Sequence, residues 1–158
     1  MKGLIFYRIL TLIVNIGCTI VGMSLVFGLA FVLSNPTMGL GFFIALGVVL
    51  YAWHANRFLL TVLIRNATTT KKHKDWLQVN AIVALVFSVL CIIQAILIIQ
   101  NPKLLVEAFK QMPANDYTSK TFTNMAIGML IFAISLLLHI VWTYILIRRK
   151  KEYFKENA

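Results

Sequence analysis

Long stretches of apolar residues alternate with short polar segments along the whole chain. The apolar stretches cover residues 9–33, 40–64, 76–100 and 122–147. Each is at least as long as the roughly 20 residues that an α-helix needs to cross the hydrocarbon core of a bilayer. Only helices or closed barrels hydrogen-bond every backbone group in that core, and runs this long and uniform favour helices. The sequence therefore predicts an all-α integral membrane protein, with four transmembrane helices in an antiparallel bundle.

Composition supports a single membrane domain over residues 1–158. Apolar residues make up 60% of the chain and charged residues only 13%, whereas about a quarter of a soluble domain is charged. The net charge of +10 raises nucleic acid as a partner. The cations lie at the ends of the apolar runs, however, so we expect no nucleic-acid binding.

The basic residues gather on one side of the predicted bundle. They precede the first run, fill the link between the second and third runs, and follow the fourth: Lys2, Arg8, Arg65, Lys71, Lys72, Lys74, Arg148, Arg149, Lys150 and Lys151. The opposite links are uncharged (34–39) or close to balanced (101–121). Because Lys and Arg favour the cytoplasmic side of a membrane, we expect both termini in the cytoplasm, in a cell membrane and most simply a bacterial inner membrane. From Arg65 onward, these residues would also attract anionic lipid headgroups.

The link 101–121 and the C-terminal tail carry further expectations. Asn101 and Pro102 suit the start of a helix and Pro113 its end, with apolar residues between them at helical spacing. This pattern predicts a short interfacial helix over about 102–112, lying on the outer membrane surface with its apolar face down. The tail 148–158 is expected to extend the fourth helix by a turn or two and then to fray.

Small residues form stripes along the apolar runs. The most regular stripe has spacings of 3, 4, 3 and 4 and comprises Ala81, Ala84, Ser88, Cys91 and Ala95; the second run has a similar row in Gly41, Ala45, Ala52 and Ala55. Such stripes let membrane helices approach closely. We interpret them as packing seams, through which the chain could also bind a protein partner or form a homo-oligomer.

Polar residues inside the runs are the candidates for chemistry, because polar and ionisable groups are costly in a bilayer. In the predicted cytoplasmic half they form a candidate belt: Asn15, His54, Arg57, Asn80 and His139. This belt could line a cavity for an anion or a lipid headgroup, with Arg57 as the anion contact, or pass a proton between histidines. A structural role is favoured, since Arg57 can extend to the headgroups, and Asn15 and His139 can hydrogen-bond across helices. Nearby, Trp53 is expected in the core and His73 in solvent.

The sequence contains no recognisable catalytic or metal-binding motif. The four apolar runs have no Asp or Glu, Cys18 and Cys91 form no C-x-x-C pair, and neither H-E-x-x-H nor G-x-S-x-G occurs. We therefore expect no enzyme activity, no metal and no cofactor.

These observations favour a non-enzymatic membrane protein that acts by association, as an accessory, scaffold or interaction subunit. Two alternatives stay open: a small channel or transporter built as a homo-oligomer, and a protein that binds lipid headgroups through the polar belt. Four transmembrane helices alone imply no particular function.

Overall fold

Four long helices dominate the computed structural model, which describes residues 2–103, 106 and 118–155. They are α1 (Lys2–Ser34), α2 (Gly39–Phe58), α3 (Lys71–Gln100) and α5 (Ser119–Arg149). Each is long and apolar enough to cross a membrane, which confirms the predicted all-α class with four candidate spans. The interfacial helix expected over about 102–112 lies mostly outside the described residues, which include only 102, 103 and 106 of that segment.

α1, α3 and α5 extend beyond the apolar runs into the polar links, whereas the second span ends where its run ends, at Ile64. α3 begins five residues earlier than expected, since the Thr70 hydroxyl accepts a hydrogen bond from the His73 backbone N–H at 3.2 Å. α2 continues into a π-helical segment, η2 (Leu59–Ile64). Asn66 then terminates the helix in the left-handed region, with φ of 50°.

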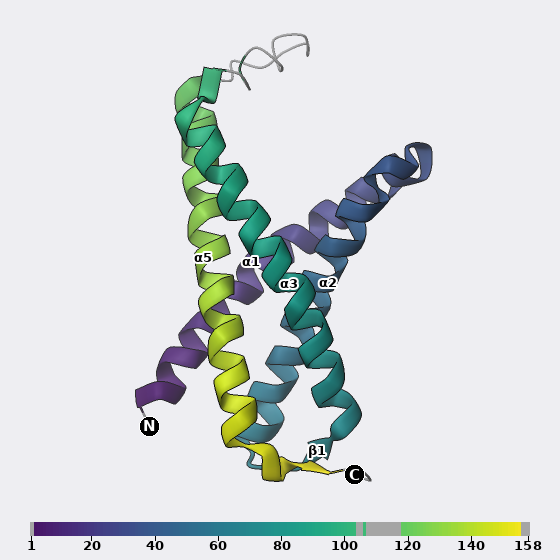
Figure 1. The fold of residues 1–158 in the computed structure, drawn as a ribbon, viewed down its shortest axis with the longest axis vertical. Coiled ribbons are helices and arrows are strands. Elements are labelled where there is room, and N and C mark those ends of the chain that lie inside the picture. Colours follow the sequence, from purple (N-terminus) through teal and green to yellow (C-terminus); the bar gives the residue numbers. More distant parts are fainter. Residues whose placement is uncertain (1, 104–105, 107–117, 156–158) are drawn as a thin grey trace.

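The helices form two antiparallel hairpins. The turn η1 (Pro36–Met38) joins α1 to α2, as the short first link predicted, and α3 pairs with α5. Each helix contacts the next in the order α1, α2, α3 and α5, and α5 contacts α1 again. The hairpins lie together at the end that carries both termini and diverge toward the other end (Figure 1). The molecule is thus a bundle at one end and two separate hairpins at the other.

Small residues bring the helices together inside the bundle. All five members of the α3 stripe are buried, as the spacing predicted: Ala81, Ala84, Ser88, Cys91 and Ala95. Two glycines mark further close approaches. A Cβ atom on Gly47 would lie 2.5 Å from Cγ1 of Val83, and one on Gly17 would overlap the ring of Phe132. A side chain at either position would require the neighbouring Phe132 or Val83 side chain to move.

A short parallel strand pair closes the end of the bundle that carries both termini. β1 (Thr69–Thr70) pairs with β2 (Phe154–Lys155), after the one-turn helix η3 (Lys151–Tyr153). The Phe154 ring also stacks on Phe58 of α2, with centroids 5.9 Å apart. The expectation of a frayed tail is therefore wrong up to residue 155, because the strand pair and this ring contact hold the tail. We call this strand pair the clasp.

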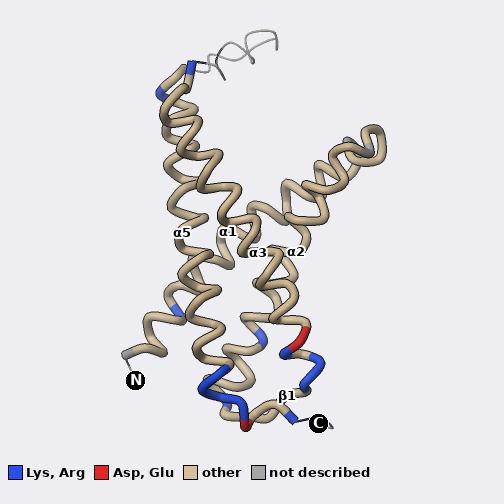
Figure 2. Tube along the Cα trace, in the orientation of Figure 1, with Lys and Arg blue, Asp and Glu red and all other residues tan. Residues whose placement is uncertain are grey.

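Most basic residues of the described chain lie around the clasp (Figure 2). We therefore call this end of the molecule the basic end. Two lysines also lie over aromatic rings there: Lys150 Nζ is 4.6 Å from the Tyr153 ring centroid, and Lys74 Nζ is 6.0 Å from that of Phe154. The aromatic residues of the tail thus keep part of the cationic surface in place.

Candidate functional site

The structure does not bring the five residues of the predicted polar belt together. His139 lies in a buried cluster, His54 contacts His73, and the Asn80 amide donates to the Trp76 carbonyl of its own helix at 2.9 Å. The remaining two, Asn15 and Arg57, line neighbouring cavities on the α1–α2 hairpin. Four separate polar environments therefore replace one belt.

The buried cluster joins three helices through side-chain hydrogen bonds, and we call it the His139 cluster. Its members are Tyr7 and Thr11 of α1, Tyr51 of α2, and His139 and Thr143 of α5, each at most 2% exposed. Nδ1 of His139 lies 2.8 Å from the Tyr51 hydroxyl, and Nε2 lies 3.0 Å from the Thr11 hydroxyl. The Tyr7 ring stacks on the imidazole, with centroids 4.8 Å apart.

Hydrogen-bond directions in the His139 cluster are determined by the two threonines. Thr11 donates its only hydroxyl hydrogen to the Tyr7 carbonyl at 2.8 Å, so Nε2 of His139 must carry a hydrogen and donate to Thr11. In the neutral imidazole, Nδ1 then accepts from Tyr51. Thr143 donates to the His139 carbonyl at 2.8 Å and accepts from Tyr7 at 3.0 Å. Every member therefore has a partner, and the arrangement suits a structural link between helices.

Sequence reasoning missed Tyr7, Tyr51 and Thr143 as members of this cluster. Tyrosine was counted as apolar, although its hydroxyl needs a partner when buried. A usable signal was present, because Tyr7 and Thr11, like His139 and Thr143, are four residues apart and therefore share a helix face.

A second polar contact joins the basic ends of α2 and α3. His54 and His73 face each other with their Nδ1 atoms 3.2 Å apart, and the Trp76 ring stacks on His54. His73 is only 6% exposed, so the expectation that it is solvated is wrong; the early start of α3 places it on the first helical turn. Its Nε2 atom is buried without a hydrogen-bond partner. Among the described residues no group of three or more metal-ligating side chains occurs.

A groove lined by both polar and apolar side chains lies on the α1–α2 hairpin, and we call it the Arg57 groove. It consists of two cavities, of about 430 and 340 Å³. The first is lined by Asn15, Cys18, Thr19, Gly22, Val49, Ala52, Trp53 and Asn56, and the second by Trp53, Asn56, Arg57 and Leu60. Trp53 and Asn56 line both cavities, so the two cavities lie next to each other. Trp53 is 71% exposed, so the expectation of a core position is wrong: it forms a wall of the groove.

Three polar side chains of the Arg57 groove have no partner among the described residues, whereas Cys18 and Thr19 donate to backbone carbonyls. Among the described residues, none forms a hydrogen bond or an ion pair with Arg57 or with the side-chain amides of Asn15 and Asn56. Residues 2–64, which include both helices of the hairpin, contain no Asp or Glu. The groove therefore combines an unneutralised cation with free amide groups.

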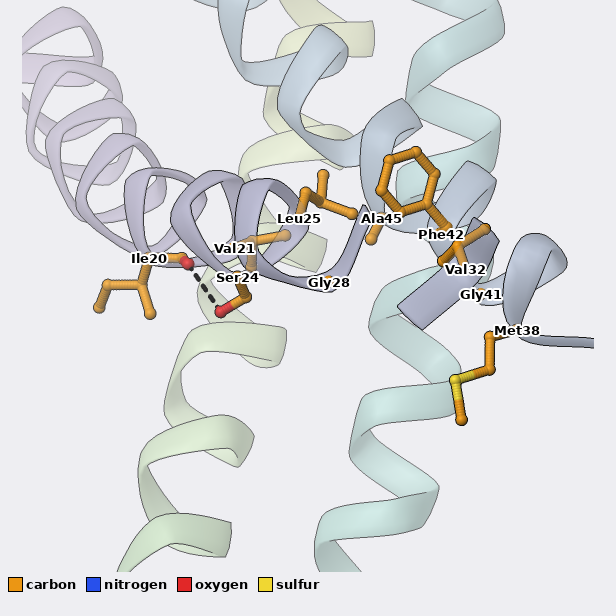
Figure 3. A pocket seen from close by; sticks show the side chains of 10 residues that line it. All are labelled: Ile20, Val21, Ser24, Leu25, Gly28, Val32, Met38, Gly41, Phe42 and Ala45. Carbon is orange, nitrogen blue, oxygen red and sulfur yellow. Dashed lines mark hydrogen bonds between the residues drawn. The ribbon is translucent and has the colours of Figure 1, made fainter. Parts of the chain in front are cut away.

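A third cavity, of about 450 Å³, lies near the η1 turn, and we call it the distal pocket. Six lining residues come from α1, three from α2 and one from the turn: Ile20, Val21, Ser24, Leu25, Gly28, Val32, Gly41, Phe42, Ala45 and Met38. Figure 3 shows that the only polar side chain, Ser24, directs its hydroxyl to the Ile20 carbonyl, at 3.0 Å. The distal pocket is therefore apolar in character and suits a hydrophobic occupant.

Comparison with protein-family models, curated proteins and solved structures gave no match to this chain.

Proposed function

We propose that the protein is a non-enzymatic accessory or scaffold subunit of a membrane complex, and that a partner helix packs at the distal pocket of the α1–α2 hairpin. The observation that carries this proposal is the pair of glycines that line the pocket. Apart from their own chain neighbours and helix backbone, neither Gly28 nor Gly41 has a heavy atom of the described residues within 4 Å of the position where a Cβ would lie.

Glycine in a helix interior costs about 0.5–1 kcal/mol relative to alanine. At Gly17 and Gly47, internal packing explains that cost, because a neighbouring side chain occupies the space of the missing Cβ. Gly28 and Gly41 have no such internal neighbour. Close approach by a helix from another chain would account for them, as small residues do at interfaces between membrane helices.

The low burial of α1 supports the same proposal. Only 6% of the residues in its most apolar stretch are buried, compared with 39%, 22% and 33% for the three later spans in chain order. Low burial alone would be explained if α1 faces lipid. Contact with lipid would not, however, require glycines on that surface. The combination of low burial with glycines in the distal pocket favours a protein neighbour over lipid alone.

The proposed setting is a bacterial inner membrane with the basic end in the cytoplasm. The positive-inside bias supports this orientation. Arg65 follows η2, and Lys71, Lys72 and Lys74 lie in the first turn of α3. Arg148, Arg149, Lys150 and Lys151 lie at the end of α5 and just after it. In that orientation, anionic lipid headgroups would contact these side chains.

Native mass spectrometry of the tagged protein, extracted from its own membranes in mild detergent, tests the proposal. We expect a defined heteromeric complex, which Gly28→Leu and Gly41→Leu weaken by filling the contact surface. Ala30→Leu is the control, because Ala30 is an exposed small residue of the same helix as Gly28 that does not line the distal pocket. A wild-type protein that isolates as a monomer would contradict the proposal, and a homo-oligomer would favour the channel or transporter alternative.

A further inference from the structure

We infer that the Arg57 groove binds the headgroup of an anionic phospholipid, with the phosphate at Arg57 and the ester region against Asn56 and Asn15. This inference does not rest on the proposed partner helix, because the two cavities of the Arg57 groove share no lining residue with the distal pocket.

The charge balance of the groove favours an anion. Arg57 is exposed and has no carboxylate partner among the described residues. A guanidinium presents several N–H donors in a planar fork that matches two phosphate oxygens at once. In a low-dielectric surrounding, an unpaired cation is costly, and a bound phosphate would remove that cost.

The amide groups of the groove suit the ester region of a lipid. Asn56 and Asn15 are half-buried, and their side-chain N–H groups have no acceptor among the described residues. A glycerolipid carries ester carbonyls next to its phosphate, and carbonyl oxygens accept hydrogen bonds from such amides. Trp53 adds an exposed aromatic wall beside both cavities, in keeping with the preference of tryptophan for the headgroup region.

The order of residues along α2 gives the lipid a direction. Arg57 and Leu60 line the smaller cavity, toward the basic end, whereas Val49 and Ala52 line the larger cavity, farther from it. At 1.5 Å per residue, Val49 lies roughly 12 Å from Arg57 along the helix axis. An acyl chain could therefore follow Val49 and Gly22 into the bilayer while its phosphate stays at Arg57. A free phosphate ion would leave the larger cavity unfilled, so the lipid is the favoured source of the anion.

The test uses the full-length protein in nanodiscs of phosphatidylcholine with or without 20 mol% phosphatidylglycerol, analysed by native mass spectrometry. We expect the wild type to retain about one phosphatidylglycerol per chain after release from the nanodisc. Arg57→Gln should reduce that retention by roughly tenfold or more, the effect of losing a charge-assisted hydrogen bond. Asn56→Leu, which leaves the charge unchanged, should reduce it as well. Circular dichroism and gel filtration of each variant would establish that it folds.

Arg65→Gln is the matched control, because it removes the same charge from an exposed arginine that lines neither cavity. Equal loss of lipid from Arg57→Gln and Arg65→Gln would overturn the inference in favour of general attraction to the basic end. Failure of the wild type to retain phosphatidylglycerol over phosphatidylcholine would overturn it too. Displacement of the lipid by millimolar inorganic phosphate would assign the groove to a soluble anion, whereas retention in phosphate supports the lipid.

Discussion

The hydrogen bond between Tyr51 and His139 should be detectable as an energetic coupling between α2 and α5. The two side chains are fully buried, and the Tyr51 hydroxyl lies 2.8 Å from Nδ1 of His139. The relevant perturbation is a double-mutant cycle with Tyr51→Phe, His139→Leu and the double variant. Phenylalanine and leucine fill most of the original volume, so changes in packing stay small.

The expected magnitudes follow from the partners that each variant leaves behind. Tyr51→Phe leaves Nδ1 of His139 buried without a partner, which costs about 1–3 kcal/mol. His139→Leu removes two hydrogen bonds, at about 0.6 kcal/mol each for bonds between membrane helices. It also removes the ring contact with Tyr7, worth about 0.5–1.5 kcal/mol for a stacked pair. The Tyr51 hydroxyl can then donate to Thr143, 3.1 Å away, and Thr11 keeps the Tyr7 carbonyl.

The double variant should be less destabilised than the sum of the single variants. Each single variant loses the bond between Tyr51 and His139, so adding the two losses counts that bond twice. The coupling energy, which is the sum of the single losses minus the loss of the double variant, should be at least about 0.6 kcal/mol and of the order of the largest value for such bonds, about 1.7 kcal/mol. The assay is reversible unfolding in sodium dodecyl sulfate, followed by tryptophan fluorescence. Tyr51→Phe combined with Ser88→Ala serves as a control, because Ser88 of α3 bonds only within its own helix. Additivity of Tyr51→Phe and His139→Leu within about 0.5 kcal/mol would refute the reasoning.

Three further predictions concern other contacts. Gly17→Ala should destabilise the protein by about 1–3 kcal/mol through overpacking against Phe132. Gly28→Ala should be neutral or stabilise the protein by up to about 1 kcal/mol. Thermal unfolding in detergent compares the two variants, and equal losses of stability would contradict the packing of α1 on α5. His54→Leu should lower the stability by about 1–3 kcal/mol, because it leaves both ring nitrogens of His73 unpaired. His73→Leu should lower the stability less, because it removes the unpaired Nε2 atom itself. A lower melting temperature for His73→Leu than for His54→Leu would contradict the contact between the two histidines. Phe154→Ala should remove a ring contact worth about 0.5–1.5 kcal/mol and speed tryptic cleavage after Lys150 by roughly two- to tenfold. Glu152→Gln is the control, because Glu152 is exposed. Unchanged cleavage of Phe154→Ala would show that the ring does not hold the tail.

The apolar pattern predicted the four helices because membrane-spanning length is a property of each segment by itself. The apolar pattern underestimated the length of α1, α3 and α5. An apolar run ends at the edge of the hydrocarbon core, whereas a helix continues to its capping residue. Thr70 illustrates this difference: its hydroxyl extends α3 to Lys71, and this extension is what places His73 against His54.

The polar sites could be predicted only in part, because they depend on which helix faces meet. His139 was identified as a candidate, but its partners Tyr51 and Thr11 come from helices whose packing order the sequence does not specify. Arg57 was grouped with His139 by depth, and Asn15 by depth and by its place on a row of small residues. Depth does not distinguish the inner face of a helix from its outer face, and the structure places these residues on the groove instead of in the interior.

The clasp has a consequence for the order in which the protein assembles. Thr69 precedes α3, and its partner Phe154 follows α5, so the second hairpin must be synthesised and inserted completely before the strands can pair. Contacts between segments so distant in sequence form late, because the chain must first be brought together. Until then, the segment between α2 and α3 has no strand partner and stays open to chaperones or proteases on its side of the membrane. Closure of the clasp would therefore be one of the last steps in the assembly of a newly made chain.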